Sequence, residues 1–208
     1  MIRIAALLLL AACSSNPPVE SSPTTQVPSA APSSSLPEPT DVPFAVRGLA
    51  NGAYAPQVVG TDARDGSAFV LSEFLGDSRV HPTKAAIVSF SASWCGPCRA
   101  SLPQLADLKA EHGEELLILI ISIDDGQAGL QAEIRAVEAA GLDAPVIHGD
   151  EALQRAWLGD TRNIPHLFIV NQIGEVLVQD RGYGSNVQRV LPRQLGYALD
   201  HPEYVDRD

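Results

Sequence analysis

The sequence predicts an α/β domain whose central mixed β-sheet is covered by helices on both faces. Apolar runs of strand length alternate with segments of helical period, and the chain closes with a β-hairpin and one more helix, an order that favours this architecture. The 208 residues are 45% hydrophobic and 19% charged, which is sufficient for a packed core. The net charge of −11 disfavours a nucleic-acid-binding protein, since such a protein needs a basic surface.

The predicted domain opens with a β-hairpin. Two short apolar segments, 57–60 and 68–71, flank the dipeptide Asp65-Gly66, which is typical of a tight turn between strands. Residues 72–76 then have the composition of a single helical turn, and we expect the Ser72 side chain to cap it.

Strands and helices alternate through the rest of the chain. The run 116–123 is apolar and rich in β-branched residues, which predicts a strand buried on both faces. Glycines follow the predicted helices as stop signals. The remaining expected elements are a strand at 85–92, a helix at 95–112, a helix at 127–140, a strand at 145–148, a helix at 151–158, a hairpin with strands at 166–170 and 175–179 around a turn at 171–174, and a final helix at 186–199 that contains Pro192.

Residues 1–12 have the pattern of an export signal, with Arg3 ahead of an apolar run that is too short to span a membrane. The sequence Leu10-Ala11-Ala12-Cys13 resembles a bacterial lipobox. This resemblance implies cleavage before Cys13, a lipid on its sulfur, and an exported protein that is anchored to a membrane and faces the periplasm. Ser14 after the cysteine favours the outer membrane. A plain signal peptide with a chance cysteine is the alternative.

The chain therefore divides into a signal peptide (1–12), a linker that starts at the lipidated cysteine (13–43) and one globular domain (44–208). The linker holds eight of the sixteen prolines, eight serines and no aromatic residue. Because proline neither continues a helix nor donates to a sheet, we expect an extended, solvated tether. A ligand for SH3-like domains is the alternative for this segment.

The chemistry is concentrated in Trp94-Cys95-Gly96-Pro97-Cys98, where a buried strand gives way to a helix. At a helix N-terminus, unpaired backbone amides and the helix dipole lower the pKa of a thiol. We therefore expect Cys95 to attack a substrate disulfide and Cys98 to resolve the mixed disulfide, while Pro97 helps to start the helix. Trp94 is expected beside the cysteines, shaping the contact surface.

Other uses of the cysteine pair fit the residues poorly. Covalent haem needs a histidine after Cys98, where this chain has Arg99, and a zinc site needs further ligands close by. An inert structural disulfide stays open. The pair Asp124-Asp125 is more typical of a helix cap and turn than of metal ligands. We expect no bound metal, haem or nucleotide, and a redox-active Cys95–Cys98 disulfide in their place.

In these motifs, residues 53–200 resemble the thioredoxin superfamily, and within it the exported TlpA/ResA-like thiol–disulfide oxidoreductases. The resemblance implies a thioredoxin fold with an N-terminal β-hairpin and an inserted helix–strand unit. It further implies a cis-proline at Pro165 and a backbone contact from Ile164 to the substrate chain. Besides the cysteine motif, the matching features are Ala55-Pro56 with the opening hairpin, Pro103 inside the first helix, Ile164-Pro165 before a strand, and the segment 127–148 as the insertion.

Three positions depart from the family pattern. Thioredoxins carry a buried acid six residues before the first cysteine, and this chain has Ser89 there, so another group or water must take the proton of Cys98. Ser91 stands where an aromatic residue is common. His166 follows Pro165, and its protonated imidazole would favour the Cys95 thiolate, unless the ring only fills a strand position.

Taken together, the sequence predicts a membrane-anchored, exported thiol–disulfide oxidoreductase. The Gly96-Pro97 dipeptide favours a reductase of disulfides in exported proteins, with apocytochromes c among the substrates that the resemblance suggests. The electrons would come from a thiol or electron donor protein in the membrane or periplasm, because that compartment is oxidising. A disulfide oxidase or isomerase on the same scaffold is one alternative, and a non-catalytic binding lipoprotein is another.

Overall fold

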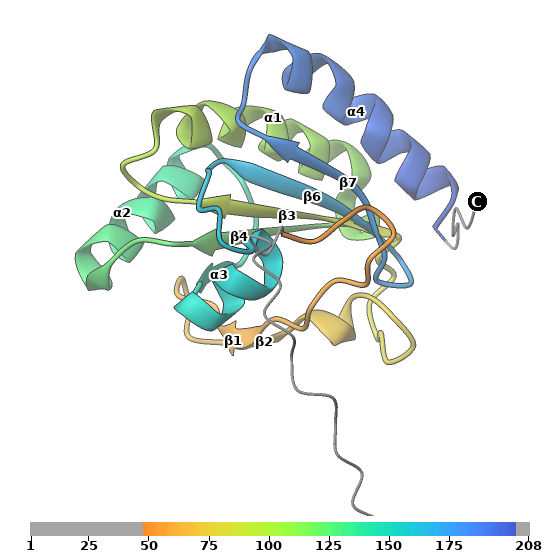
Figure 1. Cartoon of the computed structure of the whole chain (residues 1–208), viewed down its shortest axis with the longest axis horizontal. Coiled ribbons are helices and arrows are strands. Elements are labelled where there is room, and N and C mark those ends of the chain that lie inside the picture. Colours follow the sequence, from red (N-terminus) through yellow and green to blue (C-terminus); the bar gives the residue numbers. More distant parts are fainter. Residues whose placement is uncertain (1–47, 203–208) are drawn as a thin grey trace, which may run out of the picture. The chain divides into compact units, whose positions relative to one another are not determined.

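A computed structural model describes residues 48–202 of the chain. The predicted signal peptide (1–12), Cys13 with its lipid, and the predicted linker (13–43) lie outside the described residues, as do 44–47 and 203–208. Within the described part, the expected α/β architecture is present (Figure 1).

The core of the fold is a five-stranded mixed sheet with the strand order β5-β4-β3-β6-β7. The first three of these strands run parallel to one another, and β6 and β7 are antiparallel additions on the other side of β3. Every residue of β3 and β4 is buried, as their apolar sequences predict for strands covered on both faces. The strands are β3 (Ala85–Ser91), β4 (Leu116–Ser122), β5 (Val146–His148), β6 (His166–Asn171) and β7 (Val176–Arg181).

The predicted N-terminal hairpin forms a separate two-stranded sheet, β1 (Val59–Thr61) with β2 (Ala68–Val70). Its connection runs from residue 62 to 67, and Gly66 adopts a φ of +82° in it, a conformation that glycine adopts without steric cost. The expected cap at Ser72 is wrong. The short 3₁₀ helix that follows starts at Leu71, so Ser72 lies inside it, and the helix has no side-chain cap.

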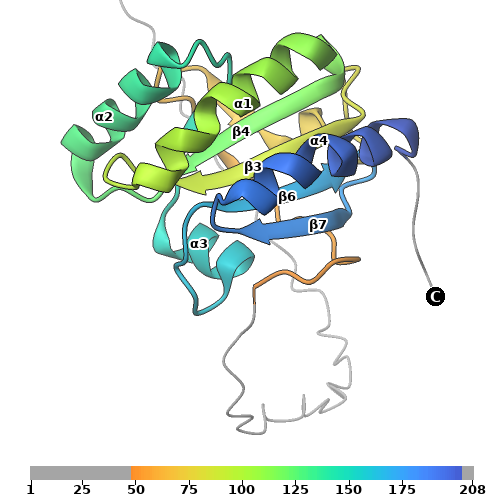
Figure 2. The same cartoon turned by 90° about the horizontal axis from the view of Figure 1, so that it is seen from above.

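Three helices cover one face of the sheet: α1 (Gly96–His112), α2 (Gly126–Ala139) and α4 (Ser185–Asp200). Alternate residues of β3 and β4, such as Ile87 and Ile118, pack against Leu105 of α1 in this layer. Figures 1 and 2 show α1 and α4 crossing the same side of the sheet. Because side chains alternate along a strand, the polar residues Ser89 and Ser91 also belong to this face.

The opposite face is covered by α3 (Glu151–Leu158) and the β1–β2 hairpin. Its centre is an aromatic cluster in which the Trp157 ring meets Phe168 edge-on and lies tilted to Phe90. All three rings are fully buried. The inserted unit expected at 127–148 is α2 with β5, and β5 extends the sheet as an edge strand beside β4.

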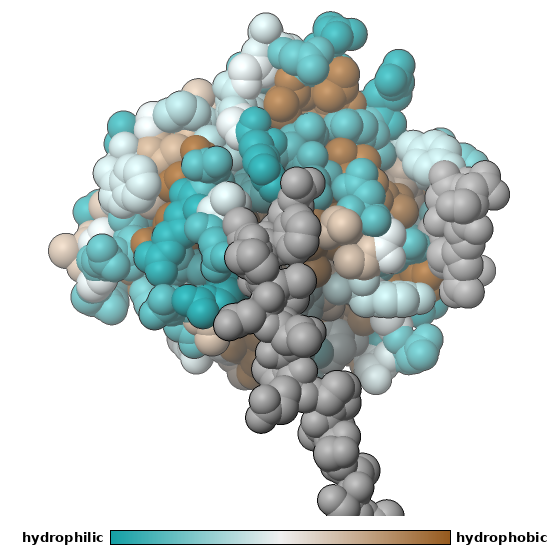
Figure 3. Space-filling model, viewed as in Figure 1, coloured by the Kyte–Doolittle hydropathy of each residue, from teal (hydrophilic) through white to brown (hydrophobic). Residues whose placement is uncertain are grey.

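The outer surface that Figure 3 presents is mixed, with small groups of hydrophobic residues separated by polar ones. The large apolar side chains of the described residues are mostly in the two layers beside the sheet. None of the helices within residues 48–202 combines the length and apolar character that crossing a membrane requires.

Candidate active site

Cys95 and Cys98 form a disulfide at the N-terminus of α1, directly beyond the carboxyl end of the central strand β3. Cys95 is the N-cap residue of the helix, and its Sγ accepts a hydrogen bond of 3.2 Å from the backbone N–H of Cys98. That amide and the positive end of the helix dipole face the same sulfur. Once the disulfide is reduced, both favour a thiolate on Cys95.

The two cysteines differ in their surroundings. Cys98 is 1% exposed and has Ala92 in its buried cluster, whereas Cys95 is 5% exposed and lies next to exposed residues on both sides. Gly96 and Pro97 are exposed, and Pro97 stands in the first turn, where the missing N–H leaves no hydrogen bond unmade. A partner molecule therefore reaches the pair from the side of Cys95.

The Trp94 side chain is 67% exposed beside the disulfide. It lies on the surface of the site and is not packed into the core, which leaves its flat ring free to contact a partner. Ile164 packs against the small cluster formed by Ala92, Cys95 and Cys98. The bond from Ile164 to the buried Pro165 is cis, and the carbonyl of Pro165 accepts from the N–H of Gly182 at 2.7 Å.

The loop between β3 and the disulfide is fixed by Asp124, which sequence reasoning treated only as part of a cap and turn. Its carboxylate is buried at the end of β4 and accepts from the Ser93 N–H (2.8 Å), the Ser93 hydroxyl (2.7 Å) and the Ser122 hydroxyl (2.9 Å). Gly129 leaves room for it, because a Cβ there would lie 2.8 Å from Asp124 Oδ1. Asp125 alone is the N-cap residue of α2, without a side-chain cap bond.

A second buried carboxyl that sequence reasoning missed is Glu133 of α2. It is fully buried, and its Oε1 accepts from the Ser91 hydroxyl on β3. Burial raises the pKa of Glu133 above its usual value, and the charge of Asp124 acts in the same direction, against the Ser91 hydrogen bond and the charge of Arg99. The sequence signal for this burial is the spacing between Leu130 and Glu133, which places both side chains on the buried face of the helix.

His166 fills a position of strand β6, which is one of the two roles that the sequence left open. Its ring stacks on Phe168, whose side chain belongs to the layer of α3 and not to the layer of α1. The ring Nε2 is 3.1 Å from the Gln179 amide oxygen. Burial lowers the pKa of His166 to about 4, although the Gln179 hydrogen bond opposes this shift, so the imidazole is neutral at neutral pH. A protonated imidazole that favours the Cys95 thiolate is therefore contradicted.

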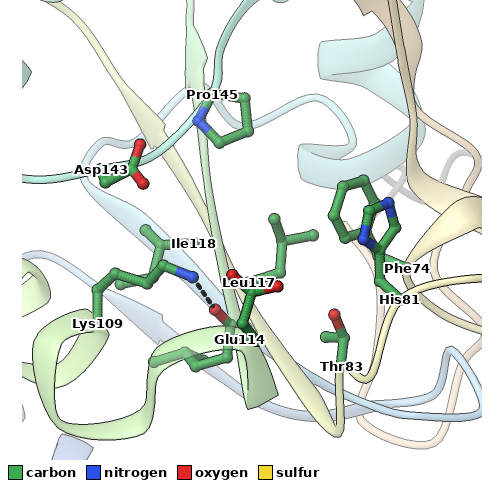
Figure 4. Close-up of a pocket in the computed structure, with 10 residues that line it drawn as sticks. Phe74, His81, Thr83, Lys109, Glu114, Leu117, Ile118, Asp143 and Pro145 are labelled. Atoms are coloured by element: carbon green, nitrogen blue, oxygen red, sulfur yellow. Dashed lines mark hydrogen bonds between the residues drawn. The ribbon is translucent and has the colours of Figure 1, made fainter.

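A metal site and a small-molecule pocket are the other kinds of site to consider in the described residues. Within 48–202, no three His, Cys, Asp or Glu side chains form a group that could hold a metal ion. A cavity of about 180 Å³ lies at the amino end of β4, and Figure 4 shows residues that line it. The Nζ of Lys109, which lines this cavity, donates to the carbonyl oxygens of Gly113 and Leu116. Leu116 pairs with Ala85, at the end of the sheet opposite the cysteines.

Comparisons with known proteins agree with this geometry. A family model described as Redoxin matches residues 50–191. The chain is 36% identical over 61 residues to the thioredoxin-like protein slr1139 of Synechocystis, which covers 29% of this chain and 56% of that protein. It is 27% identical over 112 residues to the thiol-disulfide oxidoreductase ResA of Halalkalibacterium halodurans, covering 52% of this chain and 62% of that one. The chain thus spans little more than half the length of these curated relatives.

Solved structures share the fold at low sequence identity. The crystal structure of a thiol:disulfide interchange protein of the thioredoxin family from Chlorobium tepidum matches with a TM-score of 0.58 and 24% identity. The match covers 73% of this chain and 99% of that chain. The thioredoxin fold that the cysteine motif and the hairpin indicated is therefore confirmed for the described residues.

Proposed function

This chain belongs to the Redoxin family of thioredoxin-like oxidoreductases, and we propose that it reduces disulfide bonds in exported proteins while anchored to a bacterial membrane. The reaction is dithiol–disulfide exchange through a mixed disulfide on Cys95. In this cycle Cys95 attacks a substrate disulfide, and Cys98 then attacks the Cys95 sulfur and releases the substrate as a thiol.

The observation that carries the proposal is the unequal placement of the two sulfurs at the start of α1. Cys95 receives the amide hydrogen bond and borders the surface, while Cys98 is closed off beneath the helix. The first step of exchange needs an accessible thiolate and the second needs a neighbour shielded from other disulfides, so the two cysteines suit these two steps in this order.

The reducing direction is supported by the dipeptide between the cysteines, since Gly96-Pro97 is the pair that reducing thioredoxins carry. Electrons would come from a donor protein in the membrane or periplasm. The acceptors are disulfide-bearing exported proteins, apocytochromes c among them. The relative named ResA supports an oxidoreductase of this class, and its name specifies no substrate.

The equilibrium reduction potential of the Cys95–Cys98 pair tests the direction. The full chain is titrated against defined thiol–disulfide buffers, with Cys98→Ser as the control that lacks the Cys95–Cys98 disulfide. We expect a value at or below roughly −270 mV, as in thioredoxin. A value close to about −120 mV would mean a strong oxidant and would contradict the reducing direction. If no reversible two-electron transition occurred, the oxidoreductase proposal itself would be wrong.

The membrane anchor is a separate part of the proposal and rests on the lipobox pattern ending at Cys13. We expect the chain produced in bacteria to incorporate labelled fatty acid and to sediment with membranes. The Cys13→Ser chain should lose both properties while retaining its disulfide chemistry. Unchanged membrane association of Cys13→Ser would refute the lipid anchor.

A further inference from the structure

The buried sulfur of Cys98 needs a proton partner, and the position where thioredoxins hold an acid for it is Ser89 here. Each reduction of the disulfide makes a thiolate at Cys98, and each oxidation must remove a proton from it. Because Cys98 is 1% exposed, bulk water has little access to this sulfur. A titratable group inside the protein is therefore expected on the side of Cys98 that faces the sheet.

Glu133 is placed for this task. Cys98 is the first buried residue of α1, and this helix begins just beyond the carboxyl end of β3, so the buried sulfur lies at the end of the sheet where β3 finishes. Ala92, the residue after β3, belongs to the same buried cluster as both cysteines. Ser91, one residue earlier on β3, donates its hydroxyl hydrogen to Oε1 of Glu133. The carboxyl of Glu133 is thus held at the end of β3 that leads to the disulfide, and it lies close enough to Arg99, the residue after Cys98, for that charge to oppose the rise in its pKa that burial causes.

The second oxygen of the carboxyl is free to exchange a proton. Oε2 of Glu133 is buried and has no hydrogen-bond partner in the structure. A buried polar atom without a partner is costly and calls for an explanation, and a redox role beside the disulfide is one such explanation. The structure shows the oxidised protein, and a disulfide has no proton to share.

We propose that Glu133 is the proton donor and acceptor for the Cys98 sulfur, acting from the sheet side with the Ser91 hydroxyl orienting its carboxyl. The inference rests on the proposed dithiol–disulfide exchange and assigns a new proton-transfer residue to it. The raised pKa of Glu133 agrees with this role, because a carboxyl that stays protonated above its usual range has a proton to give in the oxidised protein.

A thiolate of the reductant attacks Cys95 Sγ, the S–S bond breaks, and its electron pair goes to the Cys98 sulfur, which takes the proton of Glu133 and leaves a carboxylate. A second thiol of the reductant then releases Cys95, so two electrons have passed to the protein. When the protein reduces a substrate, Glu133 takes the proton back from Cys98 as this sulfur attacks Cys95, and the substrate thiolate leaves.

The test compares Glu133→Gln with wild type in the rate of disulfide reduction by dithiothreitol, measured in the full chain from pH 5 to pH 9. Taking the ratio of the two rates at each pH cancels the titration of the reductant. We expect wild type to be about 100-fold faster at pH 5, the scale of general acid catalysis, and the ratio to fall towards one as Glu133 ionises. The charged groups facing Glu133 are Arg99 on α1 and Asp124 after β4, and both are present in each protein.

Glu175→Gln is the matched control. Glu175 is also buried with a partnerless Oε2, but it lies after β6, at the end of the sheet away from the cysteines. We expect this variant to follow the wild-type profile. A Glu133→Gln profile equal to that of wild type, or a ratio that is the same at every pH, would overturn the proposal, because a purely structural role does not depend on the protonation of Glu133.

Ser91→Ala provides a second route that leaves the carboxyl in place, and it should reproduce the loss of rate at low pH. A third measurement needs no variant: the ¹³C resonance of the Glu133 carboxyl is titrated in the oxidised and the reduced wild-type chain. We expect different midpoints in the two states, and identical midpoints would refute the coupling. If dithiothreitol did not reduce the wild-type chain at all, the proposed function would fail and not the role of Glu133 alone.

Discussion

Replacing Asp124 by alanine is expected to destabilise the domain by about 3 kcal/mol, because hydrogen bonds to a charged group contribute about 1.5–3 kcal/mol each. Three donors lose their acceptor in this variant, two from Ser93 and one from Ser122. The donors on Ser93 are half-exposed and can turn to water, so their loss is partly compensated. The Ser122 hydroxyl is fully buried and cannot turn to water, so the full free-energy cost of its lost hydrogen bond remains.

Asparagine at the same position should cost much less, about 1 kcal/mol. Its single carbonyl oxygen can replace Oδ2, which accepts from the Ser93 N–H and the Ser122 hydroxyl, and its amide can donate to the Ser93 hydroxyl oxygen. The order of stability is therefore wild type, Asp124→Asn and then Asp124→Ala. Because Ser93 immediately precedes Trp94, the alanine variant should also loosen the loop that carries Cys95.

Urea unfolding of the oxidised chain, followed by far-ultraviolet circular dichroism, measures these differences. Asp125→Ala is the control at the neighbouring position, where the exposed side chain makes no cap hydrogen bond, and it should change stability by less than about 0.5 kcal/mol. If Asp124→Ala cost no more than Asp125→Ala, or if the asparagine variant were as unstable as the alanine variant, hydrogen bonding by the carboxylate would not be what fixes this loop.

Three further predictions concern single side chains. Burial lowers the pKa of His166 to about 4, whereas a histidine in the unfolded chain takes up a proton near pH 6.5. The free energy of unfolding should therefore fall as the pH drops through this range, by about 2 kcal/mol between pH 7 and pH 5. In urea unfolding, the His166→Gln chain should lose that part of the pH dependence. Trp157→Ala should lower the free energy of unfolding by about 3–5 kcal/mol, because the ring is fully buried among aromatic neighbours, and a loss below 1 kcal/mol would refute that packing role. Trp94→Ala should leave the urea midpoint unchanged while the KM for a disulfide-bonded peptide rises about tenfold, equivalent to about 1.4 kcal/mol, and equal KM values would exclude Trp94 from the contact surface.

Much of the fold could be predicted because a strand that is buried on both faces consists mostly of apolar residues. The runs that became β3 and β4 consist mostly of apolar residues, and the sheet buries all of them. The cysteine pair was equally clear, since its spacing has few other uses. The prediction of a cap at Ser72 was wrong because a serine near a short helical segment is compatible with more than one first residue of the helix. In the structure the helix starts at Leu71.

Local patterns could not give the hydrogen-bond partners of the polar residues around the disulfide. Glu133 is a glutamate in an amphipathic helix, and such residues usually face water, so only its partner on another element shows why it is buried. Asp124 was assigned together with Asp125 to a cap, although the two side chains point to different environments. In both cases the partner is distant in the sequence, since Glu133 lies 42 positions after Ser91 and Asp124 lies 31 positions after Ser93.

The strand order gives β3 a neighbour on each side, so its backbone amides lie in the interior of the hydrogen-bonded sheet. Amides of this kind exchange with solvent only when the whole domain opens, whereas those of a small outlying hairpin such as β1–β2 exchange through local opening. The reactive sulfurs follow the end of β3 by a few residues. Local opening of the hairpin or of the end of α4 therefore leaves the spacing of the two sulfurs intact, and the disulfide can be exchanged repeatedly on a segment that stays closed for as long as the domain is folded.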